Sequence, residues 1–290
     1  MSDRRDLLPR ANSTGGWGYY GGKASRLEPT CWSLLALDAS TMPPGSLDPH
    51  IAFLHRLQQP SGWLLEGARL PVNISFNALV AFTWLSRSGF ASDEQCRRLL
   101  SALAAHKGVK GGKSDLVRQD GTLQGWSWID GTFSWVEPTA WALLALKKAA
   151  RAGRSPAGAI ERIAEGELLL ADRACRDGGW NYGNASVLYQ DLRSYVPTTA
   201  LTLLALQDRA NDPSVARGLA YLETHWADEI SASALGWTLV CLGVYARPLD
   251  HVRARLTDHL PHALSFGNVA DLAIAMLALS ETGGVHVFRL

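Results

Sequence analysis

The stretch Glu28-Pro-Thr-Cys-Trp-Ser-Leu-Leu-Ala-Leu37 decides the fold, because the sequence repeats it. It returns as Glu137-Pro-Thr-Ala-Trp-Ala-Leu-Leu-Ala-Leu146 and, less closely, as Thr198-Thr-Ala-Leu-Thr-Leu-Leu-Ala-Leu206. Looser copies begin at Asn77, Leu235 and Leu272. The equivalent positions are 30, 77, 139, 199, 235 and 272, and the last two intervals, 199 to 235 and 235 to 272, are 36 and 37 residues. Such a period fits two helices with their turns, so the sequence predicts six helical-hairpin repeats.

Each repeated stretch is apolar on nearly every side, which predicts a helix buried all round. Pro29 and Pro138 suit a first helical turn, where a missing N–H costs nothing. Amphipathic stretches alternate with these helices, at 49–58, 93–106, 156–171, 213–226 and 250–260. The alternation predicts an inner and an outer ring, that is, an all-α fold of the α/α-toroid (α6–α6 barrel-like) type. We expect a single domain over 1–290, with residues 1–14 as an N-terminal arm in place of the first outer helix.

Composition narrows the class of protein. The chain has 290 residues, of which 47% are hydrophobic, enough for a large core. Its 28 basic residues balance 27 acidic ones, so charge gives no reason to expect nucleic acid or an anionic membrane surface as a partner. We find no signal peptide and no apolar run long enough to span a bilayer. The four cysteines form no C-x-x-C pair and indicate buried thiols, so we expect a cytoplasmic protein; the sequence leaves its oligomeric state open.

A second phrase precedes four of the repeated helices. It occurs as Gly15-Gly-Trp-Gly-Tyr19, Gly62-Trp63, Gly125-Trp-Ser-Trp128 and Gly178-Gly-Trp-Asn-Tyr182. Glycine permits a tight turn and tryptophan can fill the gap between hairpins, so Trp17, Trp63, Trp126 and Trp180 are predicted to be packing plugs.

Gly-Trp followed by Pro-Thr and Leu-Leu-Ala-Leu resembles the repeats of squalene–hopene-type terpene cyclases and of protein prenyltransferase β subunits. The resemblance covers most of the chain and is specific for the fold rather than for an activity. It implies a toroid whose central cavity takes a small apolar, isoprenoid-type molecule.

For the cyclases, the resemblance implies a protonated carboxylic acid at the start of an inner helix, in the motif Asp-Xaa-Asp-Asp-Thr. This chain has Arg26-Leu-Glu-Pro-Thr30 and Trp135-Val-Glu-Pro-Thr139 there, so Glu28 and Glu137 take the place of the proton donor. Proline replaces the second aspartate, and the alternative is that both glutamates only favour the positive end of a helix dipole. Asp130 and Asp191, in the loops, are further candidate acids.

For the prenyltransferases, the resemblance implies a zinc ion held by an Asp, a Cys two residues later and a distant His. Asp271 stands at an inner-helix start, but residue 273 is Ala and no Asp-Xaa-Cys occurs. His251, His259 and His262 lie along an outer helix that we expect Pro261 to interrupt, and they are more simply surface histidines. We therefore predict no metal and no cofactor.

The loops at 15–28, 107–137 and 179–197 should gather at one rim, where the inner helices begin. They are rich in aromatic residues, which suit an apolar or sugar-like ligand or a carbocation. The predicted substrate-binding residues are Tyr19, Trp128, Trp135, Tyr182, Tyr195, Trp141 and Asn77. Two Gly-Gly-Lys sequences also suggest weak diphosphate binding by Lys23, Lys113 and Arg118, with a solvated loop as the alternative.

Three functions remain open on this evidence. The first is an enzyme that performs acid-initiated cyclisation or prenyl transfer on an isoprenoid, with Glu137 as general acid. The second is a non-catalytic toroid that binds a ligand or peptide. The third is a carbohydrate-active toroid in which an acidic pair such as Asp130 and Glu137 acts. A dry cavity with a carboxylic acid favours the first, a filled cavity the second, and an open cleft with two spaced carboxylates the third.

Overall fold

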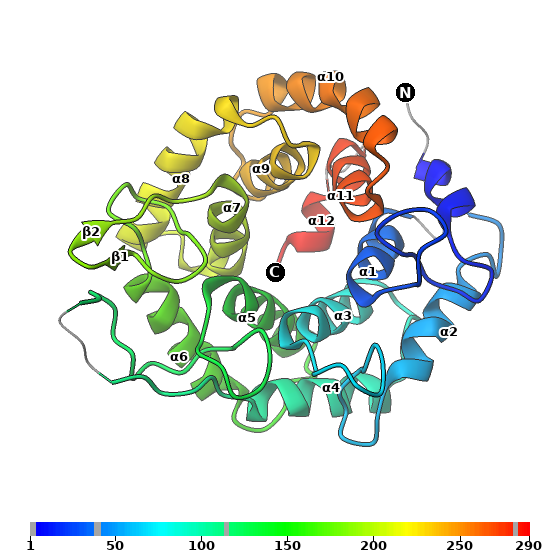
Figure 1. The fold of residues 1–290 in the computed structure, drawn as a ribbon, viewed down its shortest axis with the longest axis horizontal. Helices are drawn as coiled ribbons and strands as arrows, with labels where there is room; N and C mark the ends of the chain where they lie inside the picture. The colour runs from blue at the N-terminus through cyan, green and yellow to red at the C-terminus, as the bar shows by residue number, and fades with distance from the viewer. Residues whose placement is uncertain (1–3, 38–41, 113–115, 281–283) are drawn as a thin grey trace.

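The computed structural model describes residues 4–37, 42–112, 116–280 and 284–290, and in these the helices form two concentric rings (Figure 1). The inner ring consists of α1 (Leu27–Ala36), α3 (Ile74–Ser86), α5 (Val136–Arg151), α7 (Val196–Ala205), α9 (Ala232–Val244) and α11 (Val269–Leu279). These helices follow one another in sequence order, and α11 packs against α1 to close the ring. The predicted α/α-toroid is confirmed.

The outer ring consists of α2 (Asp48–Leu57), α4 (Asp93–Ala105), α6 (Ala159–Asp172), α8 (Pro213–His225) and α10 (Asp250–Phe266). The expected interruption at Pro261 was wrong, because α10 continues through it. Proline has no N–H, so the Thr257 carbonyl, four residues before Pro261, loses its helical hydrogen bond. Both residues lie on the exposed side of α10, where water can hydrate that carbonyl. A short 3₁₀ helix, η1 (Arg4–Arg10), packs against α11 where the first outer helix would stand.

Several shorter elements complete the fold. The 3₁₀ turns η2 (Gln207–Arg209) and η3 (Trp226–Asp228) extend α7 and α8. A small antiparallel hairpin, β1 (Ser186–Val187) with β2 (Gln190–Asp191), projects from the rim beside α7 and α8. The last helix, α12 (Val285–Phe288), lies inside the ring rather than on it (Figure 1). The sequence predicted neither the hairpin nor α12.

The six inner helices keep one register. They begin at residues 27, 74, 136, 196, 232 and 269, and each aligned repeat position stands three residues later. The repeat period therefore located every inner helix correctly, because burial on all sides leaves a continuous apolar pattern that loops do not carry.

The Gly-Trp and Pro-Thr phrases of a repeat are hydrogen-bonded to each other, and we call this pair of phrases the latch. Trp17, Trp126 and Trp180 are fully buried, and their backbone N–H groups donate to the hydroxyls of Thr30 (2.9 Å), Thr139 (3.0 Å) and Thr199 (2.9 Å). Their indole N–H groups donate to the carbonyls of Leu7 (2.8 Å), Leu103 (2.8 Å) and Leu170 (2.7 Å) near the ends of the preceding outer elements. Glycine is needed before the tryptophan, since a Cβ at Gly125 would lie 2.4 Å from the Thr139 hydroxyl oxygen.

In the second repeat the latch uses different residues. Leu64, not Trp63, occupies the plug position: its N–H donates to Asn77 Oδ1 (2.7 Å), and the Asn77 amide donates back to the Leu64 carbonyl (3.0 Å). Trp63 stays partly exposed, one residue before the plug. The plug role expected for Trp63 therefore belongs to Leu64, and fully buried Asn77 replaces the repeat threonine.

Candidate functional site

The amino-terminal ends of the inner helices surround one opening of the toroid, which we call the mouth. Each rim loop reaches the start of the inner helix before it: the carbonyls of Tyr19, Trp128 and Tyr182 accept from the first N–H groups of α11 (2.8 Å), α3 (2.8 Å) and α5 (2.9 Å). Glu66 does the same for α1 through its carboxylate, at 2.7 Å from Leu27 N. These four residues all stand two positions after a plug, so the repeats themselves place three aromatic residues and one glutamate around the mouth.

Carboxyl groups point into this mouth from several inner helices. Glu28 and Glu137 are the second residues of α1 and α5, and Ser75 holds the same position on α3 between them. Ser75 is fully buried, and its hydroxyl has no hydrogen-bond partner within the described ranges. Asp271, on α11 at the other side of α1, is close enough to Glu28 for their charges to interact. The mouth thus collects acids from α1, α5 and α11.

Glu137 is an acid whose ionisation is strongly perturbed. No hydrogen bond or ion pair from the part of the chain that the structure describes holds its carboxyl. Burial, and then the charge of Glu28, raise its pKa to about 8. The positive end of the α5 dipole would lower the pKa, so burial outweighs the dipole at this position. Glu137 therefore keeps its proton near neutral pH.

Glu28 lies in a more polar setting. Burial raises its pKa, while hydrogen bonds from the Tyr19 hydroxyl and the Trp32 side chain act in the opposite direction. Two donors favour a carboxylate, and Glu137 has none. When neighbouring acids differ in this way, one is suited to hold a proton and the other to accept one.

A layer of tryptophans lies one helical turn below the acids. Trp32, Trp141 and Trp237 come from α1, α5 and α9, which alternate around the ring. Their ring centroids lie 5.7 Å (Trp32–Trp141), 5.1 Å (Trp32–Trp237) and 5.7 Å (Trp141–Trp237) apart. The three indoles therefore meet on the toroid axis, and we call them the tryptophan triangle.

The triangle is supported from the other side by α12. The Phe288 ring centroid lies 6.2, 6.2 and 5.6 Å from those of Trp32, Trp141 and Trp237, and 4.9 Å from that of Phe82 on α3. Phe288 is 1% exposed. Aromatic side chains therefore fill the axis immediately beneath the acids.

A hollow of about 450 Å³ opens at the rim beside α5 and α7. Its lining residues are Trp135, Asn181, Tyr182, Gly183, Asn184, Asp191, Leu192, Arg193 and Tyr195. The rings of Tyr182 and Tyr195 lie 5.4 Å apart, and both residues are about half exposed. Tyr182 is near enough to Glu137 that, after burial, the charge of that carboxyl raises the phenol's pKa. The hollow therefore lies next to the mouth, and Tyr182 is the lining residue on which the charge of Glu137 acts.

The structure separates the remaining predicted acids from this group. The Asp130 side chain is 90% exposed, and its nearest recorded partner is His106 at 4.0 Å, at the end of outer helix α4. Asp191 pairs with Arg176 (3.0 Å) on the exposed hairpin. Within the described part of the chain, Asp130 interacts with His106, and the charge that acts on Glu137 is that of Glu28, so the two predicted acids do not form a pair. Asn77, a predicted binding residue, is enclosed in its latch, and we leave it out of the candidate site.

The predicted diphosphate residues do not gather in one place. Lys23 is exposed in the loop before α1, whereas Arg118 donates to the Ala174 carbonyl (2.8 Å) beyond α6, across the ring. Lys113 lies outside the described residues. Within the described ranges no group of three or more His, Cys, Asp or Glu side chains could hold a metal ion, and no helix is long and apolar enough to cross a membrane.

No family model and no curated protein matches the chain. Solved structures do. The apo type II terpene cyclase MstE from Scytonema aligns with a TM-score of 0.61 at 16% identity, over 96% of this chain and 95% of that one. A variant of the same cyclase in complex with geranylgeranyl dihydroxybenzoate aligns with a TM-score of 0.54 at 18% identity, over 96% and 77%. A reducing-end-xylose releasing exo-oligoxylanase complexed with xylose aligns with a TM-score of 0.58 at 12% identity, over 97% and 92%. The chain shares the toroid fold of these enzymes.

Sequence reasoning missed four residues of the mouth and the axis: Ser75, Glu66, Trp237 and Phe288. Ser75 and Glu66 could have been found by carrying the repeat register from Glu28 and Tyr19 to the second repeat. Trp237 stands four residues after the second position of α9, as Trp32 and Trp141 do on their helices. Phe288 belongs to no repeat, so no periodic signal points to it.

Proposed function

We propose that the chain binds a small isoprenoid-type molecule at its mouth and that Glu137 acts on it as a general acid in a cyclisation or isomerisation. The observation that carries the proposal is a carboxyl without hydrogen-bond donors, protonated near neutral pH, beside a second carboxyl with two donors and above three indole rings. Binding of isoprenoid-type molecules by toroids of this fold is supported by the cyclase complex with geranylgeranyl dihydroxybenzoate.

The proposed step moves one proton and one electron pair. The Glu137 O–H bond breaks as the π pair of an alkene takes the proton, and a carbocation forms at the other carbon of that double bond. A second double bond of the substrate attacks the cation and closes a ring, while indole faces stabilise the moving positive charge. A neighbouring C–H bond then gives its proton to the Glu28 carboxylate, leaving a new double bond. Transfer of that proton through solvent back to Glu137 completes a net isomerisation.

The test is product analysis by mass spectrometry after incubation with prenyl alcohols, prenyl diphosphates and polyprenes, with and without Mg²⁺. We expect a cyclised or isomerised product that does not require Mg²⁺. Glu137→Gln should abolish that product, because the amide has no acidic proton to give, while the melting temperature stays within a few degrees.

Glu66→Gln is the matched control. Glu66 is also a carboxyl at the rim, but Arg26 binds it through two hydrogen bonds of 2.8 Å and it caps α1. Its loss should reduce stability and change the rate through its charge effect on Glu28, but it should not abolish the product. Product formation by Glu137→Gln at the wild-type rate would contradict the proposal.

One observation favours a second candidate, a toroid that binds its ligand without chemistry: the tryptophan triangle and Phe288 fill the axis. Xylo-oligosaccharides belong in the same panel, because an exo-oligoxylanase shares the fold. Ligand binding without turnover would support the second candidate, and release of xylose would replace both with a carbohydrate-active function.

A further inference from the structure

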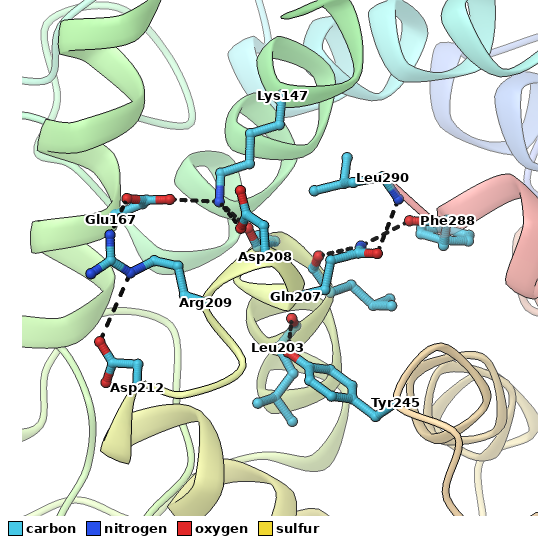
Figure 2. Close-up of polar contacts among 12 residues, drawn as sticks. Lys147, Glu167, Leu203, Gln207, Asp208, Arg209, Asp212, Tyr245, Phe288 and Leu290 are labelled. Atoms are coloured by element: carbon cyan, nitrogen blue, oxygen red, sulfur yellow. Dashed lines mark hydrogen bonds and ion pairs between the residues drawn. The ribbon is translucent and has the colours of Figure 1, made fainter. Parts of the chain in front are cut away.

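The segment from Val285 to Leu290 lies inside the toroid (Figure 1). Its contacts with Lys148 and Gln207, at the carboxyl ends of α5 and α7, place it opposite the mouth (Figure 2). It is held there by backbone groups. Lys148 Nζ donates to the Val287 carbonyl at 2.6 Å, and Gln207 donates to the Phe288 carbonyl at 2.9 Å. The Leu290 N–H donates to the Gln207 side-chain oxygen at 3.0 Å. Because these anchors are backbone atoms, they do not depend on which side chain residue 288 carries.

The backbone of Phe288 anchors the segment, whereas its side chain packs against the tryptophan triangle. The side chain makes no polar contact and points toward the axis, where its ring lies within 6.2 Å of each member of the tryptophan triangle and 4.9 Å from Phe82. Close packing leaves the indoles no room to move away from the mouth. Phe288 therefore fixes the level at which the axis is closed.

The axis is closed only a short distance below the acids of the mouth. The acids and the tryptophans stand four residues apart on the same helices, which is about 6 Å of helix rise. Helical side chains also lean toward the helix amino terminus, so the indoles incline toward the acids. The contact between the Trp32 and Glu28 side chains shows that at α1 no space separates the two layers.

We propose that Phe288 determines the length of ligand that the mouth accepts, by supporting the tryptophan triangle so that only a short isoprenoid fits above it. The inference rests on the proposed ligand class and adds the substrate's size. A longer chain cannot extend down the axis, because Trp32, Trp141, Trp237 and Phe288 already fill that space. Removing the Phe288 ring leaves an apolar void beneath the triangle into which the indoles can rotate, and such voids take up apolar groups.

The experiment measures dissociation constants for geraniol, farnesol and geranylgeraniol, which differ by one isoprene unit each, by quenching of tryptophan fluorescence. For the wild-type protein we expect geraniol to bind at least as tightly as the two longer alcohols. For Phe288→Ala we expect farnesol to bind at least about tenfold more tightly than geraniol, because each further buried methylene strengthens binding.

Two variants keep the test decisive if Phe288→Ala does not fold. Phe288→Leu leaves a smaller void and should shift the preference toward farnesol but not geranylgeraniol. Phe90→Leu makes the same change at a buried phenylalanine between α3 and α4, whose carbonyl accepts from His55 on outer helix α2, and should leave the length preference unchanged.

The outcomes separate this inference from the proposed function. Wild-type affinity that rises steadily with chain length, or a folded Phe288→Leu with the wild-type preference, would overturn the role of Phe288 and leave the proposed function intact. Failure of every alcohol to bind either protein would overturn the isoprenoid function and this inference with it.

Discussion

The two ends of the inner ring treat charge in opposite ways. At the mouth, Glu28, Glu137 and Asp271 are brought together, and burial raises the pKa of each. At the closed end, Lys147 is 4% exposed but reaches Glu167 at 2.6 Å and Asp208 at 2.5 Å (Figure 2). Arg209 extends this network to Glu167 (2.8 Å) and Asp212 (3.9 Å).

The difference indicates which end serves structure and which serves chemistry. A buried charge that is fully paired holds elements together, here α5, α6 and the turn after α7. A buried acid left without a partner weakens the fold and persists where a protonated group is useful. The Lys147 network at the closed end therefore serves stability, and the mouth keeps the perturbed acids that our proposal uses. Lys148, also at the closed end, is a perturbed base outside that network.

The largest effect should come from breaking the network of the closed end. Lys147→Met leaves Asp208 without its cation and Glu167 with Arg209 alone, and we expect a loss of about 3–5 kcal/mol in the free energy of unfolding. Urea denaturation measures it. The surface pair of Arg154 and Asp93 (2.7 Å) is the control, since Arg154→Met should cost less than about 1 kcal/mol. Equal losses in both variants would show that the closed end is not specially stabilised.

The next effect is a pH dependence at the mouth. The pKa of Glu137 is about 8 in the folded protein and about 4.3 in an unfolded chain, so the folded state binds more protons between these values. Stability should therefore fall as pH rises from about 5 to 8, by roughly 2–4 kcal/mol after allowance for solvent screening. The measurement is the difference between wild type and Glu137→Gln across this range. A constant difference would mean that Glu137 ionises normally.

The smallest of the three is an opposite pH dependence at the closed end. Burial, and then the charge of Arg87, lower the pKa of Lys148 to about 8, against about 10.4 when unfolded. The folded state then binds fewer protons between pH 8 and 10.4, so stability should rise with pH there, by about 1–2 kcal/mol relative to Lys148→Met. A difference that falls over this range would show that the Val287 carbonyl favours the charged amine enough to reverse the effect of burial.

The repeat phrase was the part of the sequence that predicted structure best. Thr30, Thr139 and Thr199 share one backbone position because each accepts the N–H of a plug tryptophan, and that requirement is local and repeated. The second repeat was harder to interpret, because Asn77 and Leu64 perform the same task with different residue types. A register argument would have corrected Trp63, whereas residue type alone pointed to the wrong position.

The candidate site was predictable only in part. Glu28 and Glu137 were located by their place before the repeat threonine, and the aromatic rim residues by the loops in which they lie; their constant distance from the plugs emerged only from the structure. Asp130, a candidate acid, lies beside His106, because the length of a loop does not specify toward which side of the rim the loop turns. The ionisation of Glu137 depends on burial by parts of the chain that are far away in sequence, and on Glu28, which lies on another inner helix.

The sequence by itself predicted the toroid, because helices that are apolar on nearly every side alternate with amphipathic ones, as an inner and an outer ring require. It also determined which helix turn carries the acids. Only the tertiary structure decided that Trp32, Trp141 and Trp237 meet on the axis and that Phe288 supports them, because these contacts join alternate helices and a non-repeated segment. A local pattern specifies where a side chain begins, but three-dimensional packing specifies what it touches and how deep the site is.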